Sequence, residues 1–331
     1  MDLTHLSPLF SKELHLSPDF FFTETSFSEQ CRLPLGLSQM AELCEMEKAG
    51  RFDFETALLK DSNSDEILGF VMIERTTDAG PGVSDGGDCL IFSPAVCVSE
   101  RKREFLDLFN ELFSNKQPMT VISVSQKEMK DDILEYYSKN ALALFGENSK
   151  ILAYDSVYSG RRVEKARKAF LRMKEEANVK LDCNAAVLEI CCGNGMSTLA
   201  LHAENISPFC LDINTEDICT GLAHGVLVPS KTMIMDATRL SEAFEQDSLD
   251  LVIGFMIGTI YEFNKQMWFS MAGEAAAVLK QNGFLFLTLR TEPEAGMVFD
   301  YLKSIGIDGK IIDNRDDETG YDQWIYVGQK Q

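Results

Sequence analysis

Basic residues are in short supply in this chain, which has 31 Lys and Arg against 52 Asp and Glu. The resulting formal net charge of −21 repels phosphate backbones, which excludes general nucleic-acid binding but leaves room for a local basic patch. Long apolar runs are also missing: the most apolar stretch, residues 251–261, is shorter than the about 20 residues of a membrane helix. The first 12 residues carry Asp2 and no apolar run typical of a signal peptide. We therefore expect a cytoplasmic protein that does not bind a membrane.

No Cys-x-x-Cys pair occurs among the nine cysteines. Their number is odd and they are scattered through apolar segments, which does not match a disulfide framework. Cys191 and Cys192 are adjacent, a spacing that suits neither two zinc ligands nor an ordinary disulfide. We expect buried free thiols and no metal site.

The length of 331 residues predicts two domains, and the pattern of the chain changes near residue 150. The first domain, residues 1–150, is predicted to be a small α+β domain without a catalytic signature. Its predicted strands are 54–59, 67–74, 89–98 and 120–124, its predicted helices are 37–48, 100–113 and 127–145, and residues 78–88 are predicted to form a loop.

The second domain, residues 151–331, alternates regularly between helices and strands after a helix at 161–176. The predicted strands of this alternating part are 186–190, 208–211, 232–235, 249–255 and 283–289. Such alternation predicts an α/β fold whose parallel sheet is covered on both faces. Two last strands, 310–312 and 323–327, are joined by an acidic turn with no helix between them, so the sheet should end in an antiparallel hairpin.

A glycine-rich turn follows the first strand of this sheet. The strand AVLEI at 186–190 runs into CCGNG at 191–195 and then into an apolar helix, an order typical of a nucleotide-binding loop. Glycines let the backbone approach a ligand closely because no Cβ intervenes. Glu189 ends an apolar strand, where a carboxylate without a partner would cost several kcal/mol.

Two aspartates follow the next two strands. Asp212 ends the second strand, 17 residues after Gly195, where a carboxylate accepts hydrogen bonds from both hydroxyls of a ribose. Asp236 ends the third strand, where a carboxylate is able to accept from the exocyclic amine of adenine. The structural alternatives are helix capping for the aspartates and simple turn formation for Gly193 and Gly195.

Segment 186–198 resembles motif I of class I S-adenosylmethionine-dependent methyltransferases, in which an acidic residue precedes a Gly-x-Gly-x-Gly turn, and the similarity extends in motif order over residues 160–331. It implies a Rossmann-like, doubly wound seven-stranded sheet with an antiparallel last strand, and S-adenosyl-L-methionine as cofactor. By this resemblance Glu189 lies near the amino group of the cofactor, the two glycines line its methionine portion, Asp212 holds the ribose, and Asp236 meets the adenine. The full set of implied cofactor-binding residues is Glu189, Cys191, Gly193, Gly195, Asp212, Ile213, Asp236, Ala237 and Phe255.

Cys191 departs from the family, which usually has glycine at its position. A side chain there narrows the loop, displaces the cofactor, or points into the sheet, and the sequence leaves these alternatives open. A dinucleotide-binding fold is the main rival interpretation. Its fingerprint needs a third glycine where this chain has Thr198, and both the antiparallel end of the sheet and Asp236 favour the methyltransferase.

The exit of the fourth strand, residues 254–262, lacks the Asn/Asp-Pro-Pro-Tyr/Phe motif, which argues against a nucleobase or a glutamine amide as methyl acceptor. Phe255 and Met256 are expected to line the methyl site. Tyr261 and Glu262 are the candidate catalytic residues that would orient an acceptor, with packing and solvent exposure as the alternatives. Transfer from a sulfonium needs a general base only when the acceptor is protonated, so the lack of an obvious base does not exclude catalysis.

The helix at 161–176 and the residues before it carry two further hypotheses. Tyr154, Tyr158 and Arg161 lie in a region that often folds over the cofactor in such enzymes, and we predict a lid there, with surface aromatics as the alternative. A cluster of basic residues is explained by a solvated helix face, or else by a docking patch for an acidic substrate or partner. Its members are Arg161, Arg162, Lys165, Arg167, Lys168, Arg172 and Lys174.

Three functions remain open on this basis. The first is a methyltransferase that acts on an O, N or S nucleophile of a small-molecule acceptor. The second is a protein side-chain methyltransferase that docks its acceptor protein through residues 1–150. The third is a non-catalytic protein that binds the cofactor and other partners. Residues 1–150 are accordingly assigned to substrate recognition, to a lid, or to dimerisation, the last of which would give a homodimer.

Overall fold

The computed structural model describes residues 20–22, 27–30, 54–74, 89–94, 98–113, 120–148, 150–181, 184–316 and 320–331, with isolated residues between 38 and 49. By its internal contacts the chain divides into two compact units, Met1–Tyr137 and Ser138–Gln331. The predicted loop at 78–88 falls wholly outside the described residues, and so does much of the predicted helix at 37–48, whose described residues are helical.

The first unit contains a five-stranded mixed sheet of order β1-β4-β3-β2-β5. Its strands are β1 Phe20–Phe22, β2 Phe54–Asp61, β3 Ile67–Glu74, β4 Cys89–Phe92 and β5 Thr120–Val124. The predicted strands at 54–59 and 67–74 are confirmed as β2 and β3, which pair antiparallel. The predicted strand at 89–98 is too long: β4 ends at Phe92, and Pro94, which has no N–H for a strand ladder, follows two residues later.

Helices accompany this sheet at the predicted places. They are α2 Phe27–Gln30, α4 Ser99–Phe113 and α5 Gln126–Asn148, so the predicted helices at 100–113 and 127–145 are confirmed. Aromatic rings fill the core of the unit. Phe70 and Phe92 stack with their centroids 4.7 Å apart, and Phe105 of α4 stacks on Phe70 at 6.2 Å. The first unit is thus an α+β structure, as the sequence predicts.

The second unit is built on a seven-stranded sheet of order β11-β12-β10-β9-β6-β7-β8. Its strands are β6 Val187–Ile190, β7 Phe209–Asp212, β8 Thr232–Ile234, β9 Leu249–Gly254, β10 Leu279–Leu289, β11 Ile307–Asp313 and β12 Trp324–Lys330. Strands β6 to β10 pair in parallel, whereas β12 lies antiparallel between β10 and β11. The predicted α/β fold with a seven-stranded sheet and an antiparallel last strand is confirmed.

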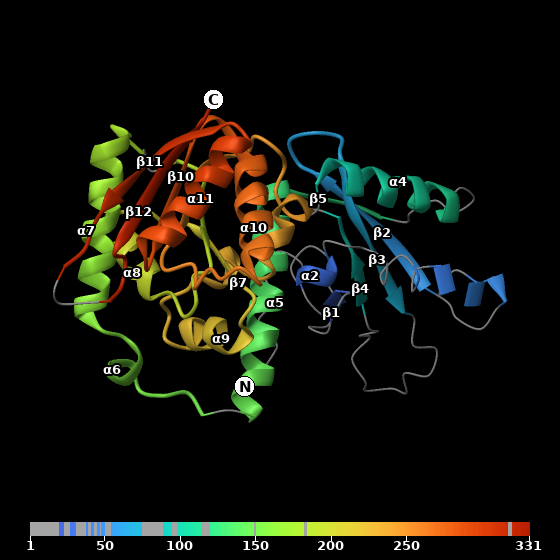
Figure 1. The fold of residues 1–331 in the computed structure, drawn as a ribbon. Coiled ribbons are helices and arrows are strands. Elements are labelled where there is room, and N and C mark those ends of the chain that lie inside the picture. Colours follow the sequence, from blue (N-terminus) through green and yellow to red (C-terminus); the bar gives the residue numbers. More distant parts are fainter. Residues whose placement is uncertain are drawn as a thin grey trace. The chain divides into compact units, whose positions relative to one another are not determined.

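Helices cover both faces of this sheet (Figure 1). On one face lie α7 Gly160–Ala177, α8 Met196–His202 and α9 Thr215–Ala223; on the other lie α10 Lys265–Val278 and α11 Glu292–Ser304. Phe170 of α7 joins a buried cluster with Ile325 of β12, while Tyr326, the next residue, lies edge-on to Phe299 of α11. The strands are therefore apolar on both sides, as parallel sheets between helical layers require. Short helical turns complete the unit: α6 Tyr154–Val157, η1 Pro229–Lys231 and η2 Ala237–Glu242.

The strand order reverses at β6. From β6 the chain proceeds outward to β7 and β8, and it then returns to form β9 on the opposite side of β6. Open α/β sheets bind ligands in the crevice outside the carboxyl ends of the strands at such a reversal. The fold alone therefore points to the ends of β6 and β9 as the place for a ligand.

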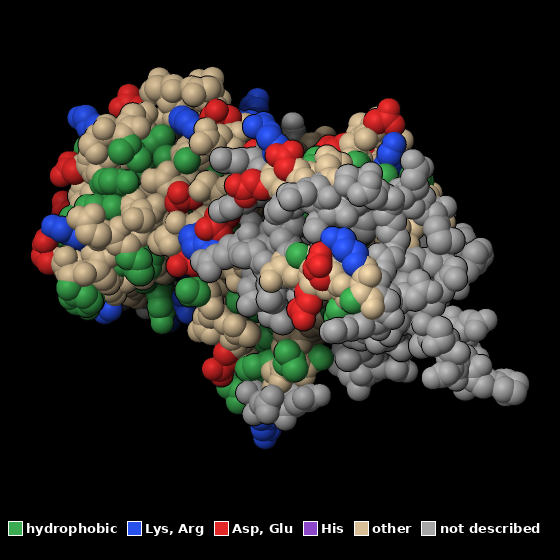
Figure 2. Space-filling model, turned by 90° about the vertical axis from the view of Figure 1, so that its right-hand side faces the viewer, with side chains coloured by type: hydrophobic (Ala, Val, Ile, Leu, Met, Phe, Trp, Pro, Cys, Tyr) green, Lys and Arg blue, Asp and Glu red, His purple; other side chains and the backbone are tan. Residues whose placement is uncertain are grey.

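On the face shown in Figure 2, acidic and basic side chains lie interspersed rather than gathered into one field of a single sign. Within the described segments, no helix combines the length and the apolar character needed to cross a membrane.

Candidate functional site

A cavity of about 260 Å³ lies at the carboxyl ends of β6 and β9, where the strand order reverses. Its walls come from the turn after β6, the start of α8, the exit of β9, the first turns of α7 and α9, and the connection before β12. The residues that line it are Arg162, Ala166, Cys191, Cys192, Gly193, Asn194, Met196, Ser197, Asp217, Phe255, Met256 and Asp322. The site thus combines segments that are far apart in the sequence.

The glycine turn takes a backbone shape that favours glycine. Gly193 has φ of 54° and Gly195 has φ of 82°, both in the left-handed region. A Cβ on Gly195 would also lie 2.8 Å from side-chain atoms of Val226 and Leu227, whereas a Cβ on Gly193 would meet nothing within 4 Å. Gly195 is therefore required by both backbone angle and space, and Gly193 by its backbone angle alone.

Cys191 adopts the left-handed shape of a glycine, with φ of 53°, although it carries a side chain. It lines the cavity, and its Sγ lies 3.7 Å from Sδ of Met271 in α10. Burial raises the pKa of its thiol to about 12, so the group is neutral. The side chain is therefore directed toward α10 while the residue still borders the cavity. Among the described cysteines of this unit, Cys192, Cys210 and Cys219 are buried free thiols, as predicted.

Glu189 is completely buried beneath the turn. Ser197 Oγ and Thr198 Oγ1 of α8 donate to its two carboxylate oxygens at 2.5 and 2.6 Å. Burial raises the pKa of this carboxyl to about 7, although the hydroxyl hydrogen bonds lower it. Glu189 does not line the cavity, so its contact with a ligand amino group stays a prediction. Dinucleotide-binding folds need a glycine where the helix packs closely against the strand. This chain has Thr198 at that place, which disfavours the interpretation as a dinucleotide-binding fold.

Asp212 holds the turn from the neighbouring strand. Its Oδ2 accepts from the N–H of Gly193 at 2.9 Å, and its Oδ1 accepts from the N–H of Asn214 at 2.8 Å. The residue that caps α9 is Asn214, so the capping alternative is wrong for Asp212. Each carboxylate oxygen has a further lone pair, which leaves Asp212 able to accept from a ligand hydroxyl. Ile213 beside it is 68% exposed.

Asp236 lies two residues beyond the end of β8, where its Oδ1 accepts from the N–H of Thr238 at 2.8 Å. It caps η2, so the capping alternative holds for this residue. Ala237 is buried next to it. Like Asp212, Asp236 stands at a strand end outside the enclosed cavity, and its contact with a ligand stays a prediction.

The exit of β9 brings Phe255 and Met256 to the cavity but not the candidate catalytic residues. Tyr261 is 54% exposed and stacks on the ring of Phe263 at 5.3 Å. Glu262 is exposed and pairs with Lys265 at 2.6 Å. The structure therefore gives no support to catalytic roles for Tyr261 and Glu262, and the alternatives of packing and solvent exposure describe them.

Asp322 is a cavity residue that the sequence does not reveal. It precedes β12, and its Oδ1 accepts from Thr288 Oγ1 of β10 at 2.5 Å. The Thr288 hydroxyl in turn accepts from the N–H of Met256 at 2.7 Å. These residues are joined only because β12 lies beside β10, so no local sequence signal could have found them.

Neither a protein-family model nor a curated protein matches this chain. Solved structures resemble it, and several of them are methyl-transferring enzymes. An S-adenosylmethionine-dependent methyltransferase from Clostridium acetobutylicum is 12% identical, with 59% of this chain and 97% of that chain covered and a TM-score of 0.41. The 1,6-didemethyltoxoflavin-N1-methyltransferase of Burkholderia thailandensis, solved with S-adenosylhomocysteine, is 13% identical, with 50% and 78% covered and a TM-score of 0.37. A ribosomal protein L11 methylase from Lactobacillus delbrueckii is also 13% identical, with 50% of this chain and 78% of that chain covered and a TM-score of 0.37. Likenesses this weak support no conclusion about function, which is proposed below from this chain's own residues.

The basic cluster of α7 is largely engaged within the molecule. Lys165 is only 9% exposed and binds Asp316 and the carbonyl of Asn314, both at 2.8 Å. Arg172 donates to the Asp313 carbonyl at 2.7 Å, and Arg162 stacks on Tyr321 at 3.8 Å. Arg167 pairs with Glu204 at 2.7 Å. These contacts tie α7 to the β11–β12 connection and to α8. The prediction of a solvent-exposed helix face is therefore wrong for Lys165. Few basic side chains of the cluster are left to dock an acidic substrate or partner.

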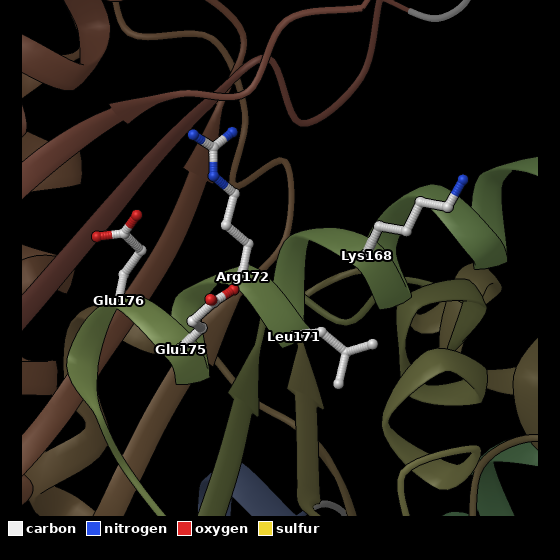
Figure 3. Close-up of a pocket in the computed structure, with 5 residues that line it drawn as sticks. All are labelled: Lys168, Leu171, Arg172, Glu175 and Glu176. Atoms are coloured by element: carbon white, nitrogen blue, oxygen red, sulfur yellow. The ribbon is translucent and has the colours of Figure 1, made fainter.

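A shallow pocket on α7 is lined by residues of that one helix (Figure 3). They are Lys168, Leu171, Arg172, Glu175 and Glu176. Figure 3 shows Arg172 and Glu176 directed to the same side of the helix, and Arg172 is bound to the β11–β12 connection. Because its side chains carry both charges and come from a single element, the pocket has no convergent polar groups of the kind that hold a ligand.

The segment before α7 is fastened to the glycine turn. Tyr158 donates its hydroxyl proton to the carbonyl of Asn194 at 2.8 Å, and Tyr154 stacks on Tyr158 at 4.5 Å. His224 lies edge-on to both rings, with Nε2 3.0 Å from the Leu152 carbonyl. Burial raises the pKa of Tyr158 to about 12, which keeps its hydroxyl protonated. The segment thus contacts the rim of the cavity, and the lid remains a prediction.

Proposed function

We propose that this chain is an S-adenosylmethionine-dependent methyltransferase that acts on an O, N or S nucleophile of a small molecule. The observation that carries this proposal is the cavity at the reversal of strand order, bounded by the left-handed glycine turn. Asp212 and Asp236 follow the next two strands, at the same edge of the sheet. At one end of this edge a ligand is able to approach the backbone closely. Along the edge two carboxylates are available to accept hydrogen bonds from the ligand.

The size of the cavity supports an extended ligand that is only partly enclosed. At about 260 Å³ it lies just below the about 300–1,000 Å³ of typical small-molecule sites. In this proposal the methionine end of the cofactor occupies the cavity and the ribose binds Asp212. The adenine lies on the exposed side chain of Ile213, near Asp236 and Ala237.

When bound, S-adenosylmethionine supplies a methyl group on a sulfonium, which is already an activated leaving group. The work left to the protein is to orient the two reactants and exclude water, and orientation contributes up to about 7–11 kcal/mol. Asp212 keeps the Gly193 N–H, and with it the turn, in place. The side chains of Phe255 and Met256 make the wall at the β9 exit apolar, which disfavours water there.

A protein side-chain acceptor is the second candidate. Tyr261 and Phe263 form a stacked pair beyond the β9 exit, and Phe263 is 85% exposed. Exposed aromatic residues are enriched in protein interfaces, which favours a partner at this place. The non-catalytic function, the homodimer and the cytoplasmic location expected from the sequence stay predictions.

Titration calorimetry with S-adenosylmethionine tests the proposal. We expect the wild type to bind and Asp212→Ala to bind about 10- to 100-fold more weakly, because it loses hydrogen bonds between a charged acceptor and the ribose. Asp308→Ala, at an exposed position of β11, is the matched control and should bind like the wild type. Absence of binding by the wild type would refute the proposal. Labelled methyl transfer to small-molecule or to protein fractions then separates the two acceptor classes.

A further inference from the structure

Three residues with left-handed backbones meet in the cavity. Cys191, Met256 and Asp322 have φ of 53°, 49° and 50°, and they come from three different strand connections. Among the described non-glycine residues with positive φ, Cys191 and Met256 are the two that are neither Asn nor Asp. Such backbones are unfavourable, persist only where the surrounding structure imposes them, and cluster at functional sites. The cavity is therefore shaped by strain on several sides.

Asp322 is held there by a directed chain of hydrogen bonds. The N–H of Met256 donates to Thr288 Oγ1, so the single proton of this hydroxyl is left to donate to Asp322 Oδ1. The backbone of Asp322 is held as well: its N–H lies 3.1 Å from Sδ of Met256, and its carbonyl accepts from Asn314 Nδ2 at 2.8 Å. The carboxylate is thus oriented as an acceptor before any ligand arrives.

The second carboxylate oxygen is the open one. Asp322 is only 4% exposed yet lines the cavity, and within the described part of the chain no hydrogen bond reaches Oδ2. Oδ2 is not among the fully buried, unpartnered side-chain atoms of the described residues, so it opens to the cavity, where a ligand N–H would donate to it. Asp217, the other carboxylate that lines the cavity, also has one oxygen bound, by Asn214 Nδ2 at 2.8 Å, but its side chain is only partly buried.

The nearby cations do not occupy Oδ2. Arg162 lines the cavity but stacks on Tyr321, and Lys165 binds Asp316 and Asn314. Burial raises the pKa of Asp322, while the Thr288 hydrogen bond and the charges of Arg162 and Lys165 lower it and Asp316 raises it. The net effect is upward, which makes this carboxylate a better proton acceptor than an ordinary aspartate.

This chemistry selects among acceptors. An anion with an open oxygen favours a cationic donor over a neutral one. A carboxylate also takes a proton far more readily from an alkylammonium, with a pKa of about 10, than from an alcohol, whose pKa is about 16. A thiol, with a pKa of about 8.5, also loses its proton readily, but it is neutral and its thiolate would be repelled by the carboxylate. The class that fits both the charge and the basicity of Asp322 is an amine.

We propose that the methyl acceptor is a small amine, which Asp322 binds as the ammonium and deprotonates through Oδ2. This inference rests on the proposed function. One N–H proton passes to Oδ2, and the freed nitrogen lone pair attacks the methyl carbon. The N–C bond forms as the C–S bond breaks, and the electron pair of that bond remains on sulfur, which becomes a neutral thioether. The methylated ammonium leaves, and the proton on Asp322 passes to solvent.

Transfer from labelled S-adenosylmethionine to a small-molecule cell extract, resolved on a cation exchanger, tests this assignment. We expect the label in the retained, cationic fraction. Asp322→Asn should lower the transfer by about 100-fold or more, the usual range for loss of a general base, with the Kd for S-adenosylmethionine changed by less than about threefold. Asp308→Asn on β11 is the matched control and should transfer like the wild type.

Label found only in the unretained or the protein fraction overturns the inference, and so does full activity of Asp322→Asn. A loss of cofactor binding by Asp322→Asn that matches its loss of transfer overturns it too, because Asp322 would then hold the methyl donor. If the wild type does not bind S-adenosylmethionine, the proposed function itself fails. Binding without label in the cationic fraction refutes only the amine acceptor.

Thr288 provides a second test in case Asp322→Asn does not fold. Thr288→Val removes the hydroxyl that orients Asp322, whereas Thr288→Ser keeps it. We expect the serine variant to retain the transfer and the valine variant to lose it, with the acidic limb of the pH profile displaced in the valine variant alone. Arg162, Lys165 and Asp316 are the charged groups around Asp322 and are the same in both variants. Equal rates and equal profiles of the two variants would overturn the inference.

Discussion

Glu189 shows how one buried carboxyl is made tolerable inside an apolar sheet. Both of its oxygens receive hydroxyl protons, from Ser197 and Thr198, which fastens the start of α8 to the end of β6. Hydrogen bonds to the charged form lower the pKa, but burial outweighs them and leaves the pKa at about 7. The residue therefore titrates near neutral pH although no solvent reaches it.

A pH-dependent stability follows from this residue. Its folded-state pKa of about 7 lies above the ordinary value of 4.5, so the folded protein binds the proton more tightly than the unfolded chain does. The stabilisation is complete below pH 4.5 and is lost as the pH rises through about 7, on the order of 3 kcal/mol in all. Glu189→Gln stays neutral and should lose this dependence. Urea unfolding of both proteins at about pH 5 and about pH 8 measures it.

The control for this prediction is Glu262→Gln, which changes an exposed carboxylate and should follow the wild type at both pH values. Parallel pH dependences of Glu189→Gln and the wild type would show that the carboxyl is not held at a raised pKa.

Among the elements, the turn between β6 and α8 depends most on backbone conformation. Gly193 and Gly195 both have positive φ, but the space around them differs. Asp212 holds this turn through the N–H of Gly193, while Tyr158 holds it through the carbonyl of Asn194. The turn is thus fixed by its own glycines and by two neighbouring elements.

A matched pair of alanine variants separates the two demands on these glycines. Gly193→Ala should lose about 1–2 kcal/mol of stability, the cost of a left-handed backbone with a Cβ. Gly195→Ala carries the same cost and must also displace the side chains of Val226 and Leu227, so it should lose clearly more. Chemical denaturation of the two variants measures the difference. Equal losses would mean that the space beside Gly195 is not limiting.

At the level of the whole molecule, the boundary between the two compact units falls within helix α5, which spans Gln126–Asn148. The part of this helix after the division belongs to the second unit. Ser138 Oγ lies 3.0 and 3.1 Å from the carbonyls of Pro229 and Thr232, and Leu142 packs on the buried cluster around Cys192. A domain that begins at residue 151, as the sequence predicts, would lack both contacts.

Two fragments test where the second domain begins. The fragment 126–331 keeps Ser138 and Leu142, and we expect it to be more stable than the fragment 151–331 by a few kcal/mol, from one hydrogen bond of about 1 kcal/mol and one partly buried leucine of about 1–2 kcal/mol. Thermal unfolding compares them. The longer fragment with Ser138→Ala and Leu142→Ala should approach the shorter one, and equal stability of the unaltered fragments would support the boundary at residue 150.

Local pattern sufficed for most elements of the second unit and for part of its site. The predicted strands at 186–190 and 208–211 correspond to β6 and β7, because an apolar run between turn residues reports burial in its own neighbourhood. The same locality placed Gly195 in the turn after the first strand and Asp212 at a strand end. Such features depend on residues within a few positions, and a sequence displays those directly.

The order of the strands and the closure of the cavity depend on distant partners instead. Placing β12 between β10 and β11 brings Asp322 to Thr288, and packing α7 on the sheet turns basic residues such as Lys165 toward the β11–β12 connection. Tyr261 and Glu262 follow the same strand as Phe255 yet lie outside the cavity. A periodic pattern states that a side chain is buried or exposed, but its partners are set by which strands lie side by side. The proposed methyl-donor site was therefore visible in the chain itself, while the carboxylate proposed to meet the acceptor appeared only once the sheet was assembled.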